Sequence, residues 1–222
     1  MRHRFAMLAC SVTILLVTAE AWAQNRPSPL IPPQSNAFGL PFAEWNALDN
    51  EFVLKSQLGG ATGLNDTIGT VRLLPADIFN PTPVFDITLH PGTAFVTPPF
   101  FVFGERYDDP KVPDDDPVAL SDTLDAIFAD AQILTVLDGR TLLEGTGAEL
   151  AQFKYGPIFF EEPVLYTDPQ PRDGVHSVAA LWAMGIGSVY RPLPIGKHTL
   201  VYTVRSSFFG NFLHTYNITV ER

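Results

Sequence analysis

Hydrophobic and polar positions alternate most regularly near the end of the chain, in residues 198–205 and 212–221, with Ser206–Asn211 between them. In a β-strand, successive side chains point to opposite faces, so a period of two separates a buried face from a wetter one. Leu200 and Tyr202 share one face in the first stretch, and His214 and Tyr216 do so in the second. The pattern predicts a β-hairpin with its tip at Ser206–Asn211 and with His214 opposite Tyr202.

Shorter apolar stretches predict the remaining elements. The run 94–103 is apolar at both parities, which is typical of a strand covered on both faces. Pro98 and Pro99 must interrupt its ladder, because proline has no N–H to donate. Apolar residues at helical spacing predict a helix over 42–57, with Trp45 in the core, and a second helix over 124–131 has Ser121 as its candidate cap.

The other predicted strands lie at 84–89, 132–137 and 158–165, and a tight turn at Asp138-Gly139 follows the second of these. Residues 177–190 favour a strand over a helix, and residues 166–174 are expected to form a loop. The 20 prolines and 16 glycines favour many short strands over a helical bundle. We predict a mainly β protein, an immunoglobulin-like or jelly-roll β-sandwich with one N-terminal and one mid-chain helix.

The start of the chain predicts export. Arg2 and Arg4 precede an apolar run over residues 5–18, and Ala21-Trp22-Ala23 has the small-x-small pattern of a cleavage site. Residues 1–23 are therefore expected to be a signal peptide, and the mature protein secreted or periplasmic. A lipoprotein signal ending at Cys10 is the alternative, but it leaves most of the apolar run behind the cysteine. Because Cys10 is the only cysteine, the chain forms no internal disulfide.

After the predicted signal, residues 24–37 are rich in proline and polar side chains and are expected to form a flexible N-terminal segment. Residues 38–222 are expected to form a single domain. The whole chain carries 14 basic and 24 acidic side chains, a net charge of −10. Such a surface repels nucleic acid and anionic membranes, so neither is an expected partner. Solubility accounts for the acidic balance, which also suits cation binding.

The ordered motifs of the chain resemble those of a family of exported bacterial proteins with no assigned activity. The matching segments are Ala-Glu-Trp-Asn-Ala at 43–47, His-Pro-Gly-Thr-Ala-Phe-Val-Thr-Pro at 90–98, Val-Leu-Asp-Gly at 136–139, Leu-Pro-Ile-Gly-Lys-His-Thr-Leu at 193–200 and Thr-Tyr-Asn-Ile-Thr-Val at 215–220. The chain departs from the family after Trp45, where relatives carry more tryptophans. The resemblance implies a β-sandwich with added helices and brings no catalytic residues.

The most charged stretch, 108–116, holds the candidate metal ligands. Ca²⁺ prefers carboxylate and carbonyl oxygens. The spacing lacks the alternating ligands, central glycine and closing glutamate of an EF-hand, and a run of aspartates is also typical of a solvated loop. The candidate calcium ligands are Asp108, Asp109, Asp114, Asp115 and Asp116.

Other side-chain constellations predict little chemistry. His198 and His214 share a hairpin face but lie about 13 Å apart along it, too far for one metal ion. Glu161 and Glu162 are neighbours on a predicted strand, so they point to opposite faces and cannot form a catalytic pair. A glycosidase would need another carboxylate, for which the candidates are Asp86, Glu144 and Glu149. The sequence has no Walker loop, G-x-S-x-G elbow, H-E-x-x-H motif or dinucleotide fingerprint.

Two functions remain open from the sequence. The first is an exported, non-enzymatic binding or structural module that contacts a glycan or a protein surface and needs no cofactor other than the candidate calcium. Phe208 and Phe209 at the hairpin tip are its candidate ligand-binding residues, and exposed Tyr155 or Tyr166 would favour glycan binding. The alternative is a carboxylate-dependent hydrolase acting on an extracellular glycan, which a buried carboxylate pair in a pocket would favour.

Overall fold

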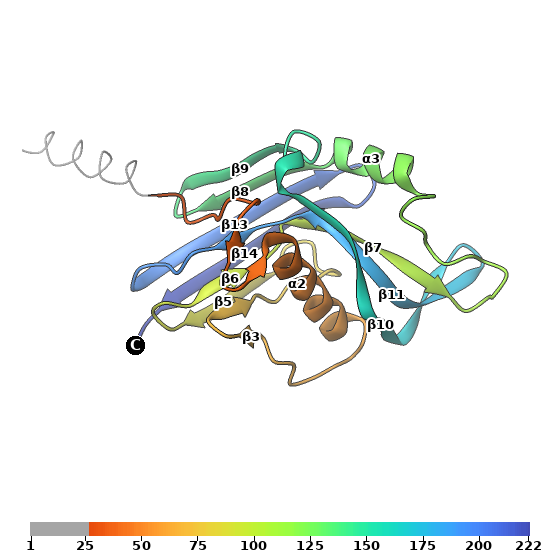
Figure 1. Ribbon diagram of the computed structural model, residues 1–222, viewed down its shortest axis with the longest axis horizontal. Helices are drawn as coiled ribbons and strands as arrows, with labels where there is room; N and C mark the ends of the chain where they lie inside the picture. The colour runs from red at the N-terminus through yellow and green to blue at the C-terminus, as the bar shows by residue number, and fades with distance from the viewer. Residues whose placement is uncertain (1–26) are drawn as a thin grey trace, which may run out of the picture.

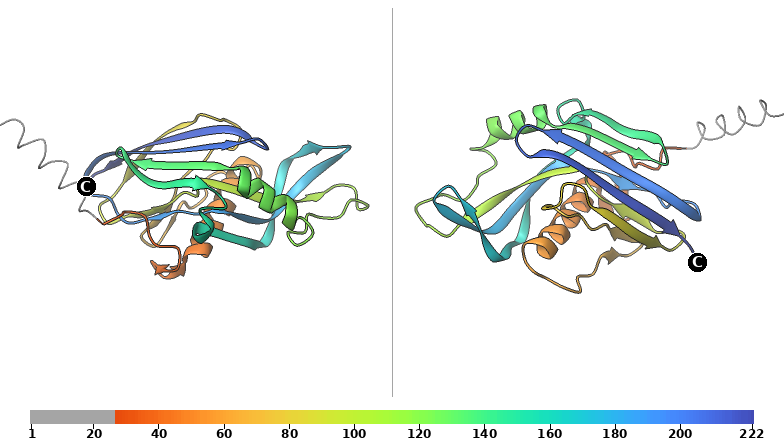
Figure 2. Two further views of the ribbon diagram at one scale, coloured as in Figure 1. Left: turned by 90° about the horizontal axis from the view of Figure 1, so that it is seen from above. Right: turned by 180° about the vertical axis from the view of Figure 1, so that it is seen from behind.

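The computed structural model describes residues 27–222, so the predicted signal peptide lies outside the described residues. As predicted, the described part of the chain is mainly β with two α-helices, and its strands form two layers with a helix outside the second (Figures 1 and 2). The first sheet has the spatial order β5 (Val84–Leu89), β14 (Gly210–Val220), β13 (Gly196–Ser206), β8 (Gln132–Leu137) and β9 (Arg140–Thr146). Neither described helix is long and apolar enough to cross a membrane.

The second layer consists of two neighbouring sheets. One has the order β10 (Lys154–Arg172), β11 (Val175–Ile186) and β7 (Phe100–Tyr107), and the other has β12 (Val189–Tyr190), β6 (Ala94–Val96), β4 (Val71–Leu73) and β3 (Thr67–Ile68). The short strands β1 (Asn36–Ala37) and β2 (Leu40–Pro41) pair just before helix α2 (Phe42–Gln57). Helix α3 (Ser121–Asp130) precedes β8, and a 3₁₀ turn, η1 (Ala151–Phe153), precedes β10.

The predicted C-terminal hairpin is confirmed. β13 and β14 pair in register with Tyr202 opposite His214, and Gly210 adopts a φ of 84° where β14 begins. Leu200 and Tyr216 lie opposite each other and are fully buried. The alternation therefore fixes which face of the hairpin joins the core.

Two of the sequence motifs meet at the other end of β13. Asp138 and Gly139 have φ values of 51° and 78°, as in the tight turn predicted between β8 and β9. The Nδ1 atom of His198 lies 2.7 Å from an oxygen of Asp138, whose other oxygen accepts the Thr199 N–H. The Nε2 atom of His198 lies 2.9 Å from the carbonyl of Pro194. His198 therefore joins the turn to the bend that leads into β13.

The run 94–103 forms one kinked ribbon rather than one strand. β6 and β7 are separated at Thr97–Pro99, as the prolines predict, and their partners β12 and β11 are separated at the same level. Alternate residues face different layers. Phe95 packs in the core between the sheets, whereas Ala94 and Val96 pack beneath α2. Burial on both faces explains why this run is apolar at both parities.

Helix α2 covers the outer face of the second layer, as Figure 2 shows. Trp45 is buried as predicted, and its indole N–H donates to the carbonyl of Ala37. The helix also buries polar side chains that the hydrophobic pattern did not indicate. Asn46 accepts the N–H of Ser188 at the break between β11 and β12, and burial raises the pKa of Asp49 well above its usual range.

Three expectations about local structure were wrong. The predicted flexible segment is held on the fold within its described part, because Leu30 and Ile31 are buried and the Ile31 N–H donates to the carbonyl of Val189. Ser121 begins α3 but does not cap it; the N-cap residue is Leu120, with no side-chain cap bond. Residues 166–172 are part of β10 rather than a loop, because β10 is an edge strand and its bulges accommodate the prolines.

Candidate functional site

An apolar pocket of about 550 Å³ lies between β7 and the β13–β14 hairpin. Of its 19 lining residues, 14 are apolar or aromatic, and they include Phe100, Val102 and Val204 from the facing strands. The segment 76–79, between β4 and β5, closes one side with Ile78 and Phe79. The polar lining side chains are Asp77, Glu105, Gln170, Arg172 and His214. We call this cavity the inter-sheet pocket.

His214 is the buried polar group on the hairpin side of the inter-sheet pocket. It is 5% exposed, its Nδ1 is hydrogen-bonded to the Tyr202 hydroxyl, and its Nε2 has no hydrogen-bond partner in the described part of the chain. The Tyr202 hydroxyl also contacts that of Tyr216, which donates to the carbonyl of Pro75 at 3.0 Å. Burial raises the pKa of both tyrosines, so they stay neutral hydroxyls.

The buried imidazole makes stability depend on pH. Burial lowers the pKa of His214 to about 4, against a smaller opposing effect of the Asp77 charge. The unfolded chain therefore takes up the proton first as the pH falls, so this stabilisation is complete above about pH 6.5 and is lost toward pH 4. Between pH 7 and pH 5, the wild type should lose about 2 kcal/mol more unfolding free energy than His214→Phe, by urea unfolding. Equal losses in the two proteins would contradict the shift.

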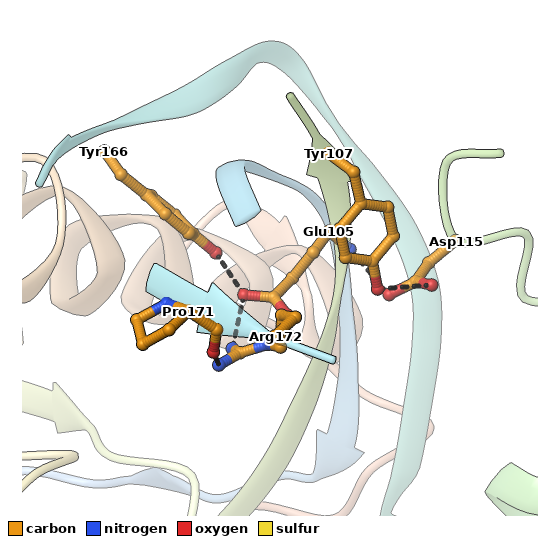
Figure 3. A network of polar contacts seen from close by, with 6 residues as sticks. All are labelled: Glu105, Tyr107, Asp115, Tyr166, Pro171 and Arg172. Atoms are coloured by element: carbon orange, nitrogen blue, oxygen red, sulfur yellow. Dashed lines mark hydrogen bonds and ion pairs between the residues drawn. The ribbon is translucent and has the colours of Figure 1, made fainter. Parts of the chain in front are cut away.

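An ion pair forms the opposite end of the inter-sheet pocket. The Arg172 guanidinium donates to both oxygens of Glu105, at 2.7 Å each, and the Tyr166 hydroxyl adds a third hydrogen bond at 3.0 Å (Figure 3). A further N–H of Arg172 donates to the carbonyl of Pro171. The Glu105 side chain is 8% exposed, so its charge is neutralised inside the protein. Burial and the Glu105 charge raise the pKa of Tyr166, which keeps it a donor.

The backbone around Glu105 is held by Asp115. The Asp115 carboxylate accepts the Glu105 N–H at 2.9 Å and the Tyr107 hydroxyl at 3.1 Å. Its own N–H donates to the Glu105 carbonyl, and its carbonyl accepts the Trp182 indole N–H at 2.8 Å. Asp115, predicted as a calcium ligand, therefore supports the end of the inter-sheet pocket through protein hydrogen bonds.

The other predicted calcium ligands do not converge. Asp108 binds the backbone and ring of His176, Asp114 pairs with Arg106, and Asp109 and Asp116 accept backbone N–H groups within their own loop. Within the described part of the chain, no group of three or more histidine, cysteine, aspartate or glutamate side chains is placed to hold a metal ion. The calcium hypothesis therefore rests on the sequence alone.

The two candidate ligand-binding residues lie at the hairpin tip as expected. Phe208 is 52% exposed, whereas Phe209 lines the inter-sheet pocket with its ring 6.1 Å from that of Phe100. The tip is fixed by Asp130 at the end of α3, whose oxygens accept three hydrogen bonds from Ser206 and Ser207. These bonds lower the pKa of Asp130.

The residues proposed for glycan chemistry lie elsewhere. Tyr155 and Tyr166, whose exposure would have favoured glycan binding, are both buried. Glu161 and Glu162 are exposed on β10 and do not line the inter-sheet pocket. The three candidate partner carboxylates, Asp86, Glu144 and Glu149, are also exposed and do not line the inter-sheet pocket.

The sequence did not indicate Glu105, Arg172 or His214 as a site. Glu105 and Arg172 lie 67 residues apart, in β7 and β10, so only the pairing of both strands with β11 brings them together. A signal was present for His214, since a histidine on the dry face of a strand is a buried polar group that needs partners.

Comparison with family models, curated proteins and solved structures found no match, so the family resemblance stays a prediction.

Proposed function

We propose that the protein is an exported binding module that holds a small apolar molecule in the inter-sheet pocket and does no chemistry on it. The size and lining of the inter-sheet pocket carry this proposal. Ligand-binding pockets typically enclose about 300–1,000 Å³ and combine apolar walls with a few placed polar groups. The inter-sheet pocket has about 550 Å³, apolar walls and a few polar lining groups, among them His214 and the Glu105–Arg172 pair.

The polar groups favour binding over catalysis. Among the described residues that line the inter-sheet pocket, none is a serine, threonine, cysteine or lysine that could act as a nucleophile. Both oxygens of Glu105 are engaged by Arg172 and Tyr166, and one oxygen of Asp77 accepts the backbone N–H groups of Phe79 and Asn80. Glu105 is therefore not free to act as one of the two carboxyl groups that glycoside hydrolysis requires.

The proposal is tested with N-phenyl-1-naphthylamine, an uncharged apolar fluorophore. The purified residues 24–222 should bind it saturably, with a rise in fluorescence. Ile78→Trp places a larger side chain in the wall formed by segment 76–79 and should weaken binding at least tenfold. Val118→Trp adds the same group at a position that is 78% exposed and outside the inter-sheet pocket, so it should leave binding unchanged.

Equal urea midpoints for both tryptophan variants would show that the weaker binding of Ile78→Trp is not caused by a loss of folding. Fluorescence that does not saturate, or that is the same in Ile78→Trp as in the wild type, would contradict the proposal.

A further inference from the structure

His214, a lining residue of the inter-sheet pocket, carries a buried Nε2 that has no hydrogen-bond partner among the described residues. His214 is 95% buried, so this nitrogen is shielded from solvent. Buried polar groups in folded proteins are nearly always hydrogen-bonded. A bound molecule that pairs with Nε2 would complete the site, and its chemistry depends on whether Nε2 donates or accepts.

Hydrogen counting along the buried chain answers that question. The carbonyl of Pro75 can only accept, so the single hydroxyl hydrogen of Tyr216 is directed to it at 3.0 Å. The Tyr216 oxygen lies 3.2 Å from the oxygens of both Tyr202 and Thr97, and its two lone pairs can accept the hydrogens of both, so it accepts the Tyr202 hydrogen. With its hydrogen used, the Tyr202 oxygen accepts from His214, which requires the proton on Nδ1. If the Tyr202 hydroxyl instead donated to Nδ1 of His214, its oxygen would need the Tyr216 hydrogen. The Pro75 carbonyl would then be unpaired, or else the two tyrosine oxygens would be in contact with no hydrogen between them.

His214 is neutral near pH 7, because burial lowers its pKa to about 4, so a ring protonated at Nδ1 has a bare lone pair at Nε2. The second acceptor in the wall is Asp77, whose carboxylate cannot donate. Among the described lining residues, Arg172 carries the one positive charge and is paired with Glu105, and the Gln170 amide donates to the carbonyl of Asp168. Beside His214 and Asp77, the inter-sheet pocket therefore offers acceptors to its ligand and disfavours an anion.

We infer that the ligand of the inter-sheet pocket is an uncharged apolar alcohol or phenol whose hydroxyl donates to Nε2 of His214. This inference rests on the proposed function and adds the class of ligand. A carboxylic acid, ionised near pH 7, would bring two acceptor oxygens against the Nε2 lone pair and the Asp77 charge. An ether of the same size would leave Nε2 unpaired.

Matched probes test the inference by isothermal titration calorimetry at pH 7. The wild type should bind 2-naphthol about tenfold more tightly than 2-methoxynaphthalene, which has no donor, and should bind 2-naphthoate most weakly. In His214→Phe, which keeps a ring but has no acceptor, the two uncharged probes should bind within about twofold of each other.

A second measurement needs no variant. Long-range ¹H–¹⁵N correlation spectra of the wild type at pH 7 should show the His214 proton on Nδ1 and Nε2 unprotonated. A proton on Nε2, or equal affinity of the wild type for 2-naphthol and 2-methoxynaphthalene, would overturn the inference and leave the proposed function standing. Failure of both uncharged probes and of N-phenyl-1-naphthylamine to bind would overturn the proposed function, and the inference with it.

Discussion

Replacing Arg172 with methionine should destabilise the protein by about 3 kcal/mol at pH 7, because a buried carboxylate is then left without its counter-ion. The Glu105 side chain is 8% exposed and receives two of its three side-chain hydrogen bonds from Arg172 (Figure 3). Methionine keeps most of the aliphatic stem, so the loss of packing is small. The Tyr166 hydroxyl remains as a donor, but it carries no charge to offset that of Glu105.

Two further variants distinguish the effect of an unpaired buried charge from the effect of losing an ordinary surface ion pair. The stability of all three variants is measured by urea unfolding. Arg106→Met breaks a pair with Asp114 whose side chains are 44% and 43% exposed, so it should cost less than about 1 kcal/mol. The double variant Glu105→Gln with Arg172→Met removes both charges and should recover most of the stability. If Arg172→Met proves no less stable than Arg106→Met, the Glu105 carboxylate is solvated and the ion pair does not organise this end of the inter-sheet pocket.

The elements that the sequence predicted best are those whose pattern is local. Alternation in the C-terminal hairpin fixed its register, with Tyr202 opposite His214, because a slip by one residue would turn the buried side chains to solvent. Apolar residues at both parities predicted that the run 94–103 is covered on both faces, and Pro98 and Pro99 predicted the break between β6 and β7. The same logic failed at residues 166–172, since proline is tolerated on an edge strand and the sequence does not say which strand lies at an edge.

The candidate site was less predictable because it is made by contacts between distant strands. Glu105 is one of 24 acidic side chains, and nothing local distinguishes it from the aspartates that follow. Its burial depends on β10 reaching far enough to bring Arg172 over β7. The acidic loop, in contrast, was conspicuous in the sequence, yet its carboxylates hold backbone groups and neighbouring side chains. The density of acidic residues suggested a calcium site, whereas in the structure these carboxylates accept hydrogen bonds that shape the loop.

The position of Glu105 also depends on the residue before it. Gly104 pairs with Trp182 across β7 and β11, and a Cβ atom at residue 104 would lie only 2.1–2.4 Å from atoms of the Trp182 ring. Trp182 is 1% exposed, and its indole N–H is bonded to the carbonyl of Asp115, so the ring has no free space into which to turn. Gly104 is therefore required by close approach of a side chain rather than by backbone freedom.

Gly104→Ala should consequently cost at least about 3 kcal/mol of unfolding free energy, as expected for overpacking at a site that cannot relax. Because the displaced ring also anchors Asp115, the variant should weaken binding of N-phenyl-1-naphthylamine as well. Gly104→Ala combined with Trp182→Phe should be more stable than the sum of the single losses predicts, since the smaller ring makes room for the methyl group. Strict additivity in urea unfolding would mean that the alanine is accommodated elsewhere in β7, and that the fit between Gly104 and Trp182 does not position Glu105.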